Sequence, residues 1–235
     1  MKGHRQTDLC GRVPALPEER FLLNRIHKRA RGLFTAAALS LLLCTTGCTS
    51  LKVLSYEGPG RDRWQQPEEV IRVLDIQPGD VVADIGSGGG YFSLHLAEAV
   101  GPEGTVYAAD IDPAMNRYLE RRARRAGHDN IKTILADPDD PNLPETGVDL
   151  IFMSNTYHYL DDPTAYFSDL QRTLGPSGRL AIIDFDGTKW RHRVTGHFSR
   201  RDEVLKELQT AGYELVEEFH FTDRQYFLVF SQSGS

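Results

Sequence analysis

From about Gln66 onward, stretches with helical periodicity alternate with short apolar runs of strand length. Strands that alternate with helices of about 10–15 residues favour a parallel sheet with helices on both faces. The predicted strands are Val81–Ala83 with Asp84 at its end, Thr105–Ala109, Ile131–Ala136, Val148–Met153, Arg179–Phe185, Tyr213–His220 and Gln225–Phe230. Because no helix separates the last two, they should form an antiparallel hairpin at one edge. The fold class is therefore α/β, with a doubly wound, mostly parallel sheet.

Prolines and capping residues predict where the helices begin and end. Helices should begin at Pro67, near Phe92, at Pro113, at Pro163 and after Ser199. We expect the fourth to run through Leu174 until Gly175-Pro176 ends it. Ser199, with Asp202 three residues later, has the spacing of a capping box.

A glycine cluster follows the first strand, in the run Asp84-Ile85-Gly86-Ser87-Gly88-Gly89-Gly90. In sheets of this kind, ligands bind beyond the carboxyl ends of the strands, and glycines let a ligand lie against the main chain. Asp110 ends the second strand, 26 residues after Asp84. This is close to the position where a carboxylate that binds a ribose is expected. The pattern therefore predicts a nucleoside-containing ligand.

Two nucleotide classes fit this loop poorly. The dinucleotide pattern Gly-x-Gly-x-x-Gly, started at Gly86, requires glycine where Tyr91 stands, and that glycine serves close helix–strand packing. Started at Gly88, the pattern puts Ser93, next to Leu94, in the third glycine position and fails again. The Gly-Lys-Ser/Thr sequence of a triphosphate-binding loop is absent from the chain. A nicotinamide-dependent oxidoreductase is therefore only a weak alternative.

The run from Asp84 to Gly90 resembles the first motif of class I S-adenosylmethionine-dependent methyltransferases, and the resemblance extends over about residues 62–232. Further segments resemble later parts of that family: Val106–Ile111, Leu135-Ala136-Asp137, Val148–Phe152 with Ser154-Asn155, and Leu174–Leu180. The segments 63–67, 157–159 and 224–227 are similar to bacterial members near the quinone-biosynthesis methyltransferases. The resemblance implies a seven-stranded sheet in the order 3-2-1-4-5-7-6 and S-adenosylmethionine as cofactor.

The same resemblance implies which residues contact the cofactor. It implies that Asp110, the acid of the second motif, binds the ribose hydroxyls of the cofactor. It also implies that Asp137 contacts the adenine. The implied cofactor-binding residues are Asp84, Gly86, Ser87, Gly88, Gly90, Tyr91, Asp110, Ile111, Asp137 and Asn155.

Methyl transfer needs the acceptor and the methyl group held at attack distance, and a neutral acceptor also needs a base. His158 and Tyr157, just past the fourth strand, are the catalytic candidates, although His158 could instead pack at the pocket wall. Weaker candidates are Asp184 and Asp186, which end the fifth strand, and His192 and His197 in a predicted lid over residues 187–198. Trp64 and Gln66 either close over the cofactor or anchor the N-terminal segment. The spacing of His and Cys predicts no metal site.

The first 48 residues have the pattern of an export signal. The uncharged stretch from Gly32 to Leu51 follows a basic run, and its apolar centre of twelve residues is short for a membrane span, which needs about twenty. Thr45-Thr46-Gly47-Cys48 resembles a bacterial lipoprotein signal, with Cys48 as lipid anchor. We therefore predict a signal over 1–48, a linker and lid over 49–65, and a methyltransferase domain over 66–235. The domain would lie on the periplasmic side, attached to the membrane; an uncleaved anchor, or a mis-assigned start before a cytoplasmic enzyme, are the alternatives.

Charge restricts the partners. Residues 1–31 carry a net charge of +5, and the rest of the chain, with 19 basic and 30 acidic groups, carries −11. Such a body matches the phosphate backbone of nucleic acids poorly. We therefore expect a methyltransferase that acts on a small or lipid-soluble acceptor, with its oligomeric state undetermined by the sequence. Because the cofactor is made in the cytosol and the signal predicts export, a non-catalytic binding module that keeps the fold is the alternative.

Overall fold

The computed structural model describes residues 58, 60–187 and 196–234. The predicted export signal, Cys48, most of the 49–65 linker and His192 lie outside these residues. No helix in the described ranges is long and apolar enough to cross a membrane.

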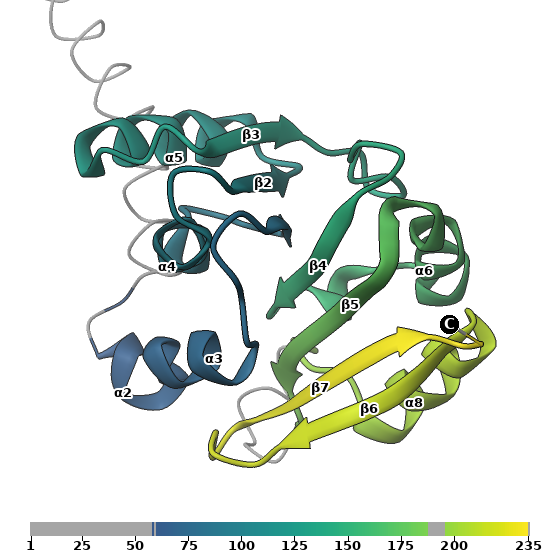
Figure 1. The fold of residues 1–235 in the computed structure, drawn as a ribbon. Coiled ribbons are helices and arrows are strands. Elements are labelled where there is room, and N and C mark those ends of the chain that lie inside the picture. Colours follow the sequence, from purple (N-terminus) through teal and green to yellow (C-terminus); the bar gives the residue numbers. More distant parts are fainter. Residues whose placement is uncertain (1–57, 59, 188–195, 235) are drawn as a thin grey trace, which may run out of the picture. The chain divides into compact units, whose positions relative to one another are not determined.

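A seven-stranded sheet forms the centre of the domain, in the order β3-β2-β1-β4-β5-β7-β6 (Figure 1). The strands are β1 (Val81–Ile85), β2 (Thr105–Asp110), β3 (Ile131–Leu135), β4 (Val148–Ser154), β5 (Leu174–Phe185), β6 (Tyr213–Phe219) and β7 (Gln225–Gln232). Strands β1 to β5 pair in parallel, whereas β7 is antiparallel to both β5 and β6. The predicted fold class, strand order and terminal hairpin are therefore confirmed.

Most of the helices lie where the prolines and capping residues predict them. They are α2 (Arg61–Gln65), α3 (Pro67–Val73), α4 (Tyr91–Val100), α5 (Pro113–Ala126), α6 (Pro163–Leu170) and α8 (Arg201–Thr210), with single 3₁₀ turns η1 (Tyr157–Tyr159) and η2 (Gln171–Thr173). Asp112 caps α5 through its side chain, which accepts from the Ala114 amide, and Gly127 ends that helix in the left-handed conformation.

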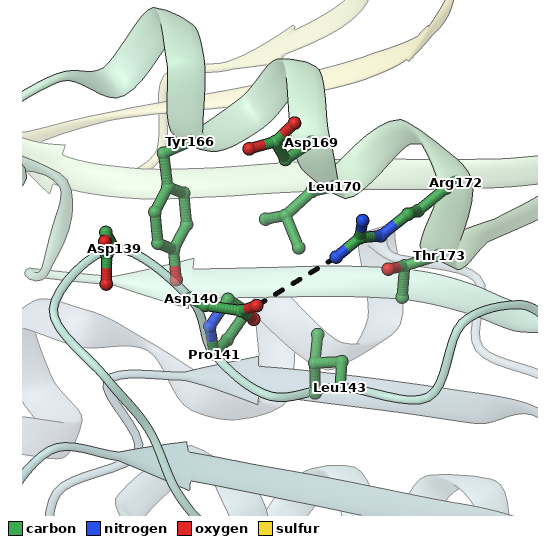
Figure 2. A pocket seen from close by; sticks show the side chains of 9 residues that line it. All are labelled: Asp139, Asp140, Pro141, Leu143, Tyr166, Asp169, Leu170, Arg172 and Thr173. Atoms are coloured by element: carbon green, nitrogen blue, oxygen red, sulfur yellow. Dashed lines mark ion pairs between the residues drawn. The ribbon is translucent and has the colours of Figure 1, made fainter.

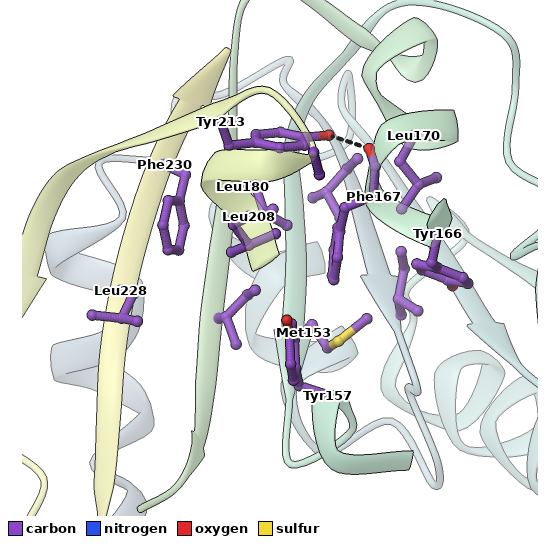
Figure 3. Close-up of a cluster of buried hydrophobic side chains, with 14 of the residues drawn as sticks. Met153, Tyr157, Tyr166, Phe167, Leu170, Leu180, Leu208, Tyr213, Leu228 and Phe230 are labelled. Atoms are coloured by element: carbon purple, nitrogen blue, oxygen red, sulfur yellow. Dashed lines mark hydrogen bonds between the residues drawn. The ribbon is translucent and has the colours of Figure 1, made fainter. Parts of the chain in front are cut away.

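Each face of the sheet carries its own apolar cluster. Side chains from α3 and α4 pack on one face, together with Val82 and Phe152 of the central strands. Side chains from α6 and α8 pack on the other face, with Ile151 and Met153 (Figure 3). The alternation of β4 between the two clusters follows from the two-residue period of a strand, and it explains why these central strands are apolar on both faces.

Two predicted helix boundaries are wrong. Helix α6 ends at Leu170, and Leu174 belongs to β5, where it pairs with Val148. The register then shifts between Val148 and Leu150, which pairs with Arg179, so Gly175-Pro176 lies in an irregular stretch of β5 and does not end a helix. The capping box at Ser199 is also wrong: Arg200 is the N-cap residue of α8, and the Ser199 hydroxyl binds Asp184.

The segment before the sheet is fixed by side chains. The Trp64 ring stacks on Phe185 at a centroid distance of 5.8 Å, and the Gln66 amide donates to the carbonyl of Phe221 at 2.6 Å. Gln65 donates to Ser154 Oγ at 2.9 Å, at the end of β4. Trp64 and Gln66 therefore anchor α2 to the carboxyl edge of the sheet.

Candidate active site

The glycine loop between β1 and α4 is shaped by positive backbone angles and close packing. Gly86, Gly88 and Gly90 all have φ between 53° and 83°. A Cβ atom at Gly86 would lie 2.1 Å from Thr156 Oγ1, and one at Gly90 would lie 2.1 Å from Leu119 Cδ1. At these two positions only glycine fits, because both the angle and the space exclude a side chain.

Asp110, at the end of β2, binds the same loop. Its carboxylate accepts from the Gly88 amide at 2.7 Å and from the Asp112 amide at 2.8 Å. The carboxylate therefore lies directly beside the glycine loop, half-buried at the carboxyl edge of the sheet. Two predicted cofactor residues from segments 22 residues apart are thus in contact.

Asp84, on β1, is a buried acid of the site. Only 3% of the residue is exposed, and Ser93 Oγ donates to Oδ2 at 2.5 Å. Burial raises the pKa of Asp84 to about 6; the Ser93 hydrogen bond opposes this, and the nearby Asp110 charge adds to it. A positively charged ligand group beside Asp84 would favour the ionised form.

Two exposed apolar side chains flank Asp110. Ile111 is 63% exposed and Leu135 is 56% exposed, and Leu135 pairs with Asp110 in the ladder between β2 and β3. Asp137 is exposed nearby, where its carboxylate accepts from Asn142 at 3.1 Å. Apolar groups of this kind suit a flat heterocycle. Sequence reasoning missed Leu135, because an apolar residue in a strand gives no signal that it faces solvent.

The residues present fit S-adenosylmethionine. Ser87, within the glycine loop, has a buried hydroxyl without a partner among the described residues, and a buried polar atom of this kind is satisfied by a ligand or water. Carboxylates at Asp84 and Asp110 suit an ammonium group and ribose hydroxyls, and Ile111 and Leu135 suit a base. No group of three or more His, Cys, Asp or Glu residues in the described ranges could hold a metal ion.

A second set of polar residues lies where β4 and β5 end. His158 Nδ1 lies 2.8 Å from Asp184 Oδ1, and the His158 amide donates to Asp184 Oδ2 at 3.1 Å. The His158 side chain is 2% exposed and that of Asp184 is 0% exposed. His158 Nε2 has no hydrogen-bond partner in the described part of the chain. The structure thus pairs two of the predicted catalytic candidates.

Tyr157 is placed in the core. Its ring stacks on Phe167 at 5.6 Å, and its hydroxyl donates to Glu207 at 2.6 Å; Figure 3 shows it beside Met153. Burial raises the pKa of the Tyr157 hydroxyl well above its ordinary value, and the hydrogen bond with Glu207 adds to this. These contacts give Tyr157 a packing role.

Tyr91 joins the glycine loop to helix α2. Its hydroxyl donates to Asp62 Oδ1 at 2.7 Å, and the Arg61 guanidinium lies 3.8 Å from the centre of its ring. Arg61 also donates to Gln65 at 2.5 Å. Tyr91 therefore holds α2 beside the start of α4, a contact between separate segments that the sequence pattern did not indicate.

Asn155 and Gln225 are hydrogen-bonded to each other at the carboxyl edge of the sheet, near β7. Asn155 has a left-handed backbone, with φ 56°, and its side-chain oxygen accepts from Gln225 at 2.5 Å. The remaining oxygen of Gln225 is buried without a partner among the described atoms. Asp186, a weaker candidate, receives no bond from His158; its amide donates to the Arg224 carbonyl at 3.4 Å.

A small pocket lies elsewhere, between the β3–β4 loop and α6 (Figure 2). Asp140 and Arg172 form an ion pair of 3.9 Å across it, and its volume is about 30 Å³. This volume holds no more than a water molecule or two. A larger hollow of about 570 Å³ includes Thr105 and Lys132 among its lining residues, at the amino ends of β2 and β3. Neither hollow lies at the edge of the sheet where ligands of this fold bind.

Comparisons with known proteins agree with this geometry. Residues 82–178 match the family described as a methyltransferase domain. The chain is 36% identical over 105 residues to a malonyl-[acyl-carrier protein] O-methyltransferase of Hahella chejuensis, covering 44% of this chain and 35% of that protein. It is 26% identical over 191 residues to a demethylmenaquinone methyltransferase of Geobacillus kaustophilus, covering 68% and 81%. The chain thus spans about a third of the first relative's length and most of the second's.

A solved structure extends the likeness to the whole sheet. The chain superposes on a SAM-dependent methyltransferase from Aquifex aeolicus with a TM-score of 0.70 and 27% identity, over 76% of this chain and 96% of the other. Residues 82–178 therefore match a methyltransferase domain, and the chain has the α/β fold of class I S-adenosylmethionine-dependent methyltransferases. A magnesium protoporphyrin IX methyltransferase from Synechocystis, solved with the same fold, has S-adenosylhomocysteine bound.

Proposed function

We propose that the protein transfers a methyl group from S-adenosylmethionine to a small or lipid-soluble acceptor by in-line displacement. The observation that carries this proposal is the pair of carboxylates, Asp84 and Asp110, on neighbouring strands β1 and β2 beside the glycine loop. Asp110 is held on the loop by the Gly88 amide, and Asp84 is buried beneath it with a raised pKa. Both carboxylates can therefore accept hydrogen bonds from a ligand that has hydroxyl and ammonium groups.

When bound, S-adenosylmethionine supplies a methyl group on a positively charged sulfur. The chain's own contribution is to bind and to orient. With the cofactor bound, Asp110 would accept hydrogen bonds from its ribose hydroxyls, Ile111 and Leu135 would cover its base, and the bare main chain of the glycine loop would permit close approach. Holding two reacting groups at attack distance supplies up to about 7–11 kcal/mol of the barrier reduction.

Isothermal titration of the full chain with S-adenosylmethionine and with S-adenosylhomocysteine tests cofactor binding. Asp110→Asn should weaken binding at least about tenfold, because a hydrogen bond to a charged group contributes about 1.5–3 kcal/mol. Asp129→Asn is the matched control, since Asp129 lies at the amino edge of the sheet and lines the hollow there. A folded wild-type protein that binds neither compound would overturn the proposal.

The acceptor is identified by transfer of a radiolabelled methyl group. The Geobacillus relative is named for demethylmenaquinone, a lipid-soluble ring compound, which supports a search among membrane extracts as well as water-soluble metabolites. Label in the chloroform phase that depends on Asp110 supports a lipid-soluble acceptor. Label only in protein would contradict the proposal of a small acceptor.

We also propose that Cys48 carries a lipid that attaches the domain to the outer face of the inner membrane. The support is the basic flank, the twelve-residue apolar centre and the small residues before Cys48. Metabolic labelling with a palmitate analogue checks this, with Cys48→Ala as control. Equal labelling of both proteins, or a chain that keeps residues 1–47, would contradict it.

A further inference from the structure

We propose that His158 is the general base of this site, that Asp184 is the residue that positions it, and that the methyl acceptor is a neutral protic group such as a hydroxyl. This inference rests on the proposed methyl transfer and names its substrate class. The observation that starts it is His158 Nε2, which is buried and without a hydrogen-bond partner among the described residues. Leaving such an atom unpaired costs free energy, so an unpaired buried atom calls for a ligand.

The partner of Nδ1 decides which ring nitrogen carries the proton. Asp184 Oδ1 and Oδ2 lie 2.8 Å and 3.0 Å from His158 Nδ1, and an ionised carboxylate only accepts hydrogen bonds. The Nδ1 atom therefore carries the hydrogen in the neutral ring. Nε2 is left with a lone pair, which is the state that a base requires.

Asp184 is itself held in one orientation. Besides the His158 ring, its carboxylate accepts from the amides of His158 and Phe185, and from the hydroxyl of Ser199 at 3.0 Å. The hydroxyls of Ser199 and Tyr226 lie 2.5 Å apart. Three segments of the chain, at His158, Phe185 and Ser199, therefore fix the carboxylate, and through it the plane of the imidazole ring.

His158 is two residues along the chain from Thr156, whose side chain fills the space beside Gly86 of the glycine loop. The rings of Tyr159 and His197 lie 4.2 Å and 5.6 Å from the His158 ring, and both residues are exposed. A ligand that moves these two rings aside reaches Nε2 from the edge of the sheet where the cofactor binds.

The surrounding charge selects against anionic acceptors. Within the described ranges, Asp184 is paired with His158 but with no Lys or Arg, so no permanent positive charge offsets its negative charge. The titratable groups around the dyad are Asp184 from β5, Asp186 after it, Tyr226 from β7, Glu207 from α8 through Tyr157, Tyr159 from η1, and His197. An anionic acceptor is repelled here, whereas a neutral hydroxyl is not, and the imidazolium that forms is stabilised by Asp184.

The acceptor oxygen forms a bond to the methyl carbon, the bond between methyl carbon and sulfur breaks with its electron pair going to sulfur, and the acceptor proton goes to His158 Nε2. The products are a methyl ether, S-adenosylhomocysteine and a protonated His158, which later returns the proton to solvent.

The first test reads the tautomer directly, in the full chain labelled with ¹⁵N at histidine. Long-range proton–nitrogen correlation at pH 8 should show the His158 ring, assigned by its loss in His158→Gln, with Nδ1 protonated and Nε2 bare. Asp184→Asn should move the proton to Nε2, because an amide nitrogen in place of an oxygen donates to Nδ1. A wild-type ring protonated at Nε2 at pH 8 would overturn the proposal.

The second test measures transfer from S-adenosyl-[methyl-³H]methionine to phenols, catechols and aliphatic alcohols, compared with carboxylates. His158→Gln should lower transfer to hydroxyls by about 10²–10⁴-fold, with cofactor affinity within twofold of wild type. His128→Gln is the matched control, because His128 lines the hollow at the opposite edge of the sheet.

Ser199→Ala provides a variant that leaves both members of the dyad in place. It should lower the rate less than Asp184→Asn does. Transfer to carboxylates alone, at a rate that His158→Gln leaves unchanged, would refute the dyad. If the wild-type protein does not bind the cofactor, the proposed methyl transfer itself is refuted. Calorimetry therefore distinguishes this outcome from a failure of the dyad proposal alone.

Discussion

Two buried aspartates at the carboxyl edge of the sheet differ in how the protein satisfies them. Asp84 on β1 receives one hydrogen bond, from Ser93, and burial raises its pKa to about 6. Asp184 on β5 receives bonds from two amides, one imidazole and one hydroxyl. In the half of the site proposed to bind the cofactor (the cofactor half), the buried acid thus has one side-chain donor. In the half proposed to bind the acceptor, the acid is satisfied, and the atom without a partner among the described residues is His158 Nε2.

Neutralising Asp184 should have the largest effect on the free energy of unfolding, and it tests the difference between the two aspartates most directly. Asp184→Asn places an amide NH₂ among donors, so at least two hydrogen bonds to a charged acceptor are lost, each worth about 1.5–3 kcal/mol. The free energy of unfolding should fall by about 4 kcal/mol, measured by urea denaturation at pH 7.5. A loss below 1 kcal/mol would show that the network around Asp184 contributes little.

The glycine loop offers a second strong test, because Gly86 and Gly88 differ in the space around them. Gly86→Ala should destabilise the fold by about 3 kcal/mol, since a left-handed angle costs about 1–2 kcal/mol and the clash with Thr156 adds overpacking. Gly88→Ala should cost only about 1 kcal/mol, because its φ is 53° but nothing lies within 4 Å of the added Cβ.

Thr156→Ala combined with Gly86→Ala refines this test. Removing the hydroxyl and methyl groups should restore part of the lost stability, because these atoms are the nearest to the added Cβ. Strict additivity of the two substitutions would mean that the contact between the loop and Thr156 is not the cause.

The sheet could be predicted from the sequence because its signals are local. Apolar runs, the Asp-Pro starts at Asp112 and Asp162 and the glycine after α5 are each contained within a few residues. The wrong helix boundaries occurred where contacts between distant segments determine the structure. Leu174 pairs with Val148 across the sheet, and Ser199 binds Asp184 in place of its own helix.

The two halves of the site differ in the same way. The contact between Asp110 and the Gly88 amide was predictable because both residues belong to one motif pattern. The bond from Ser199 to Asp184, the contact of Gln225 with Asn155 and the exposure of Leu135 join segments far apart in the chain or depend on which face a side chain takes. No periodicity indicates them.

Neutralising Asp84 should have the opposite effect to neutralising Asp184. The pKa of Asp84 rises from 3.8 to about 6, so its favourable contribution to stability is complete below about pH 4 and is lost as pH rises through about 6. At about 1.4 kcal/mol per pKa unit, the stability of Asp84→Asn relative to wild type should increase by about 3 kcal/mol between pH 4 and pH 7.

Urea denaturation of both proteins across this pH range gives the answer. Parallel stability curves would show that Asp84 is not perturbed by burial. Saturating S-adenosylmethionine should reduce the stability that the wild type loses relative to Asp84→Asn at pH 7. The ligand should stabilise Asp84→Asn less, because its positive charge favours the ionised carboxylate of the wild type.

The smallest expected effect concerns the apolar residues beside Asp110, where the cofactor half is exposed and not buried. Ile111→Ser should leave the free energy of unfolding within about 0.5 kcal/mol of wild type, because Ile111 is 63% exposed. The same change should weaken S-adenosylhomocysteine binding about tenfold, since burying an aliphatic side chain under a ligand contributes about 1.5–3 kcal/mol. Leu135→Ser should behave alike, whereas Val216→Ser, at an exposed apolar residue of β6, should change neither quantity. Equal affinity in all three variants would place the base of the cofactor elsewhere than over β2 and β3.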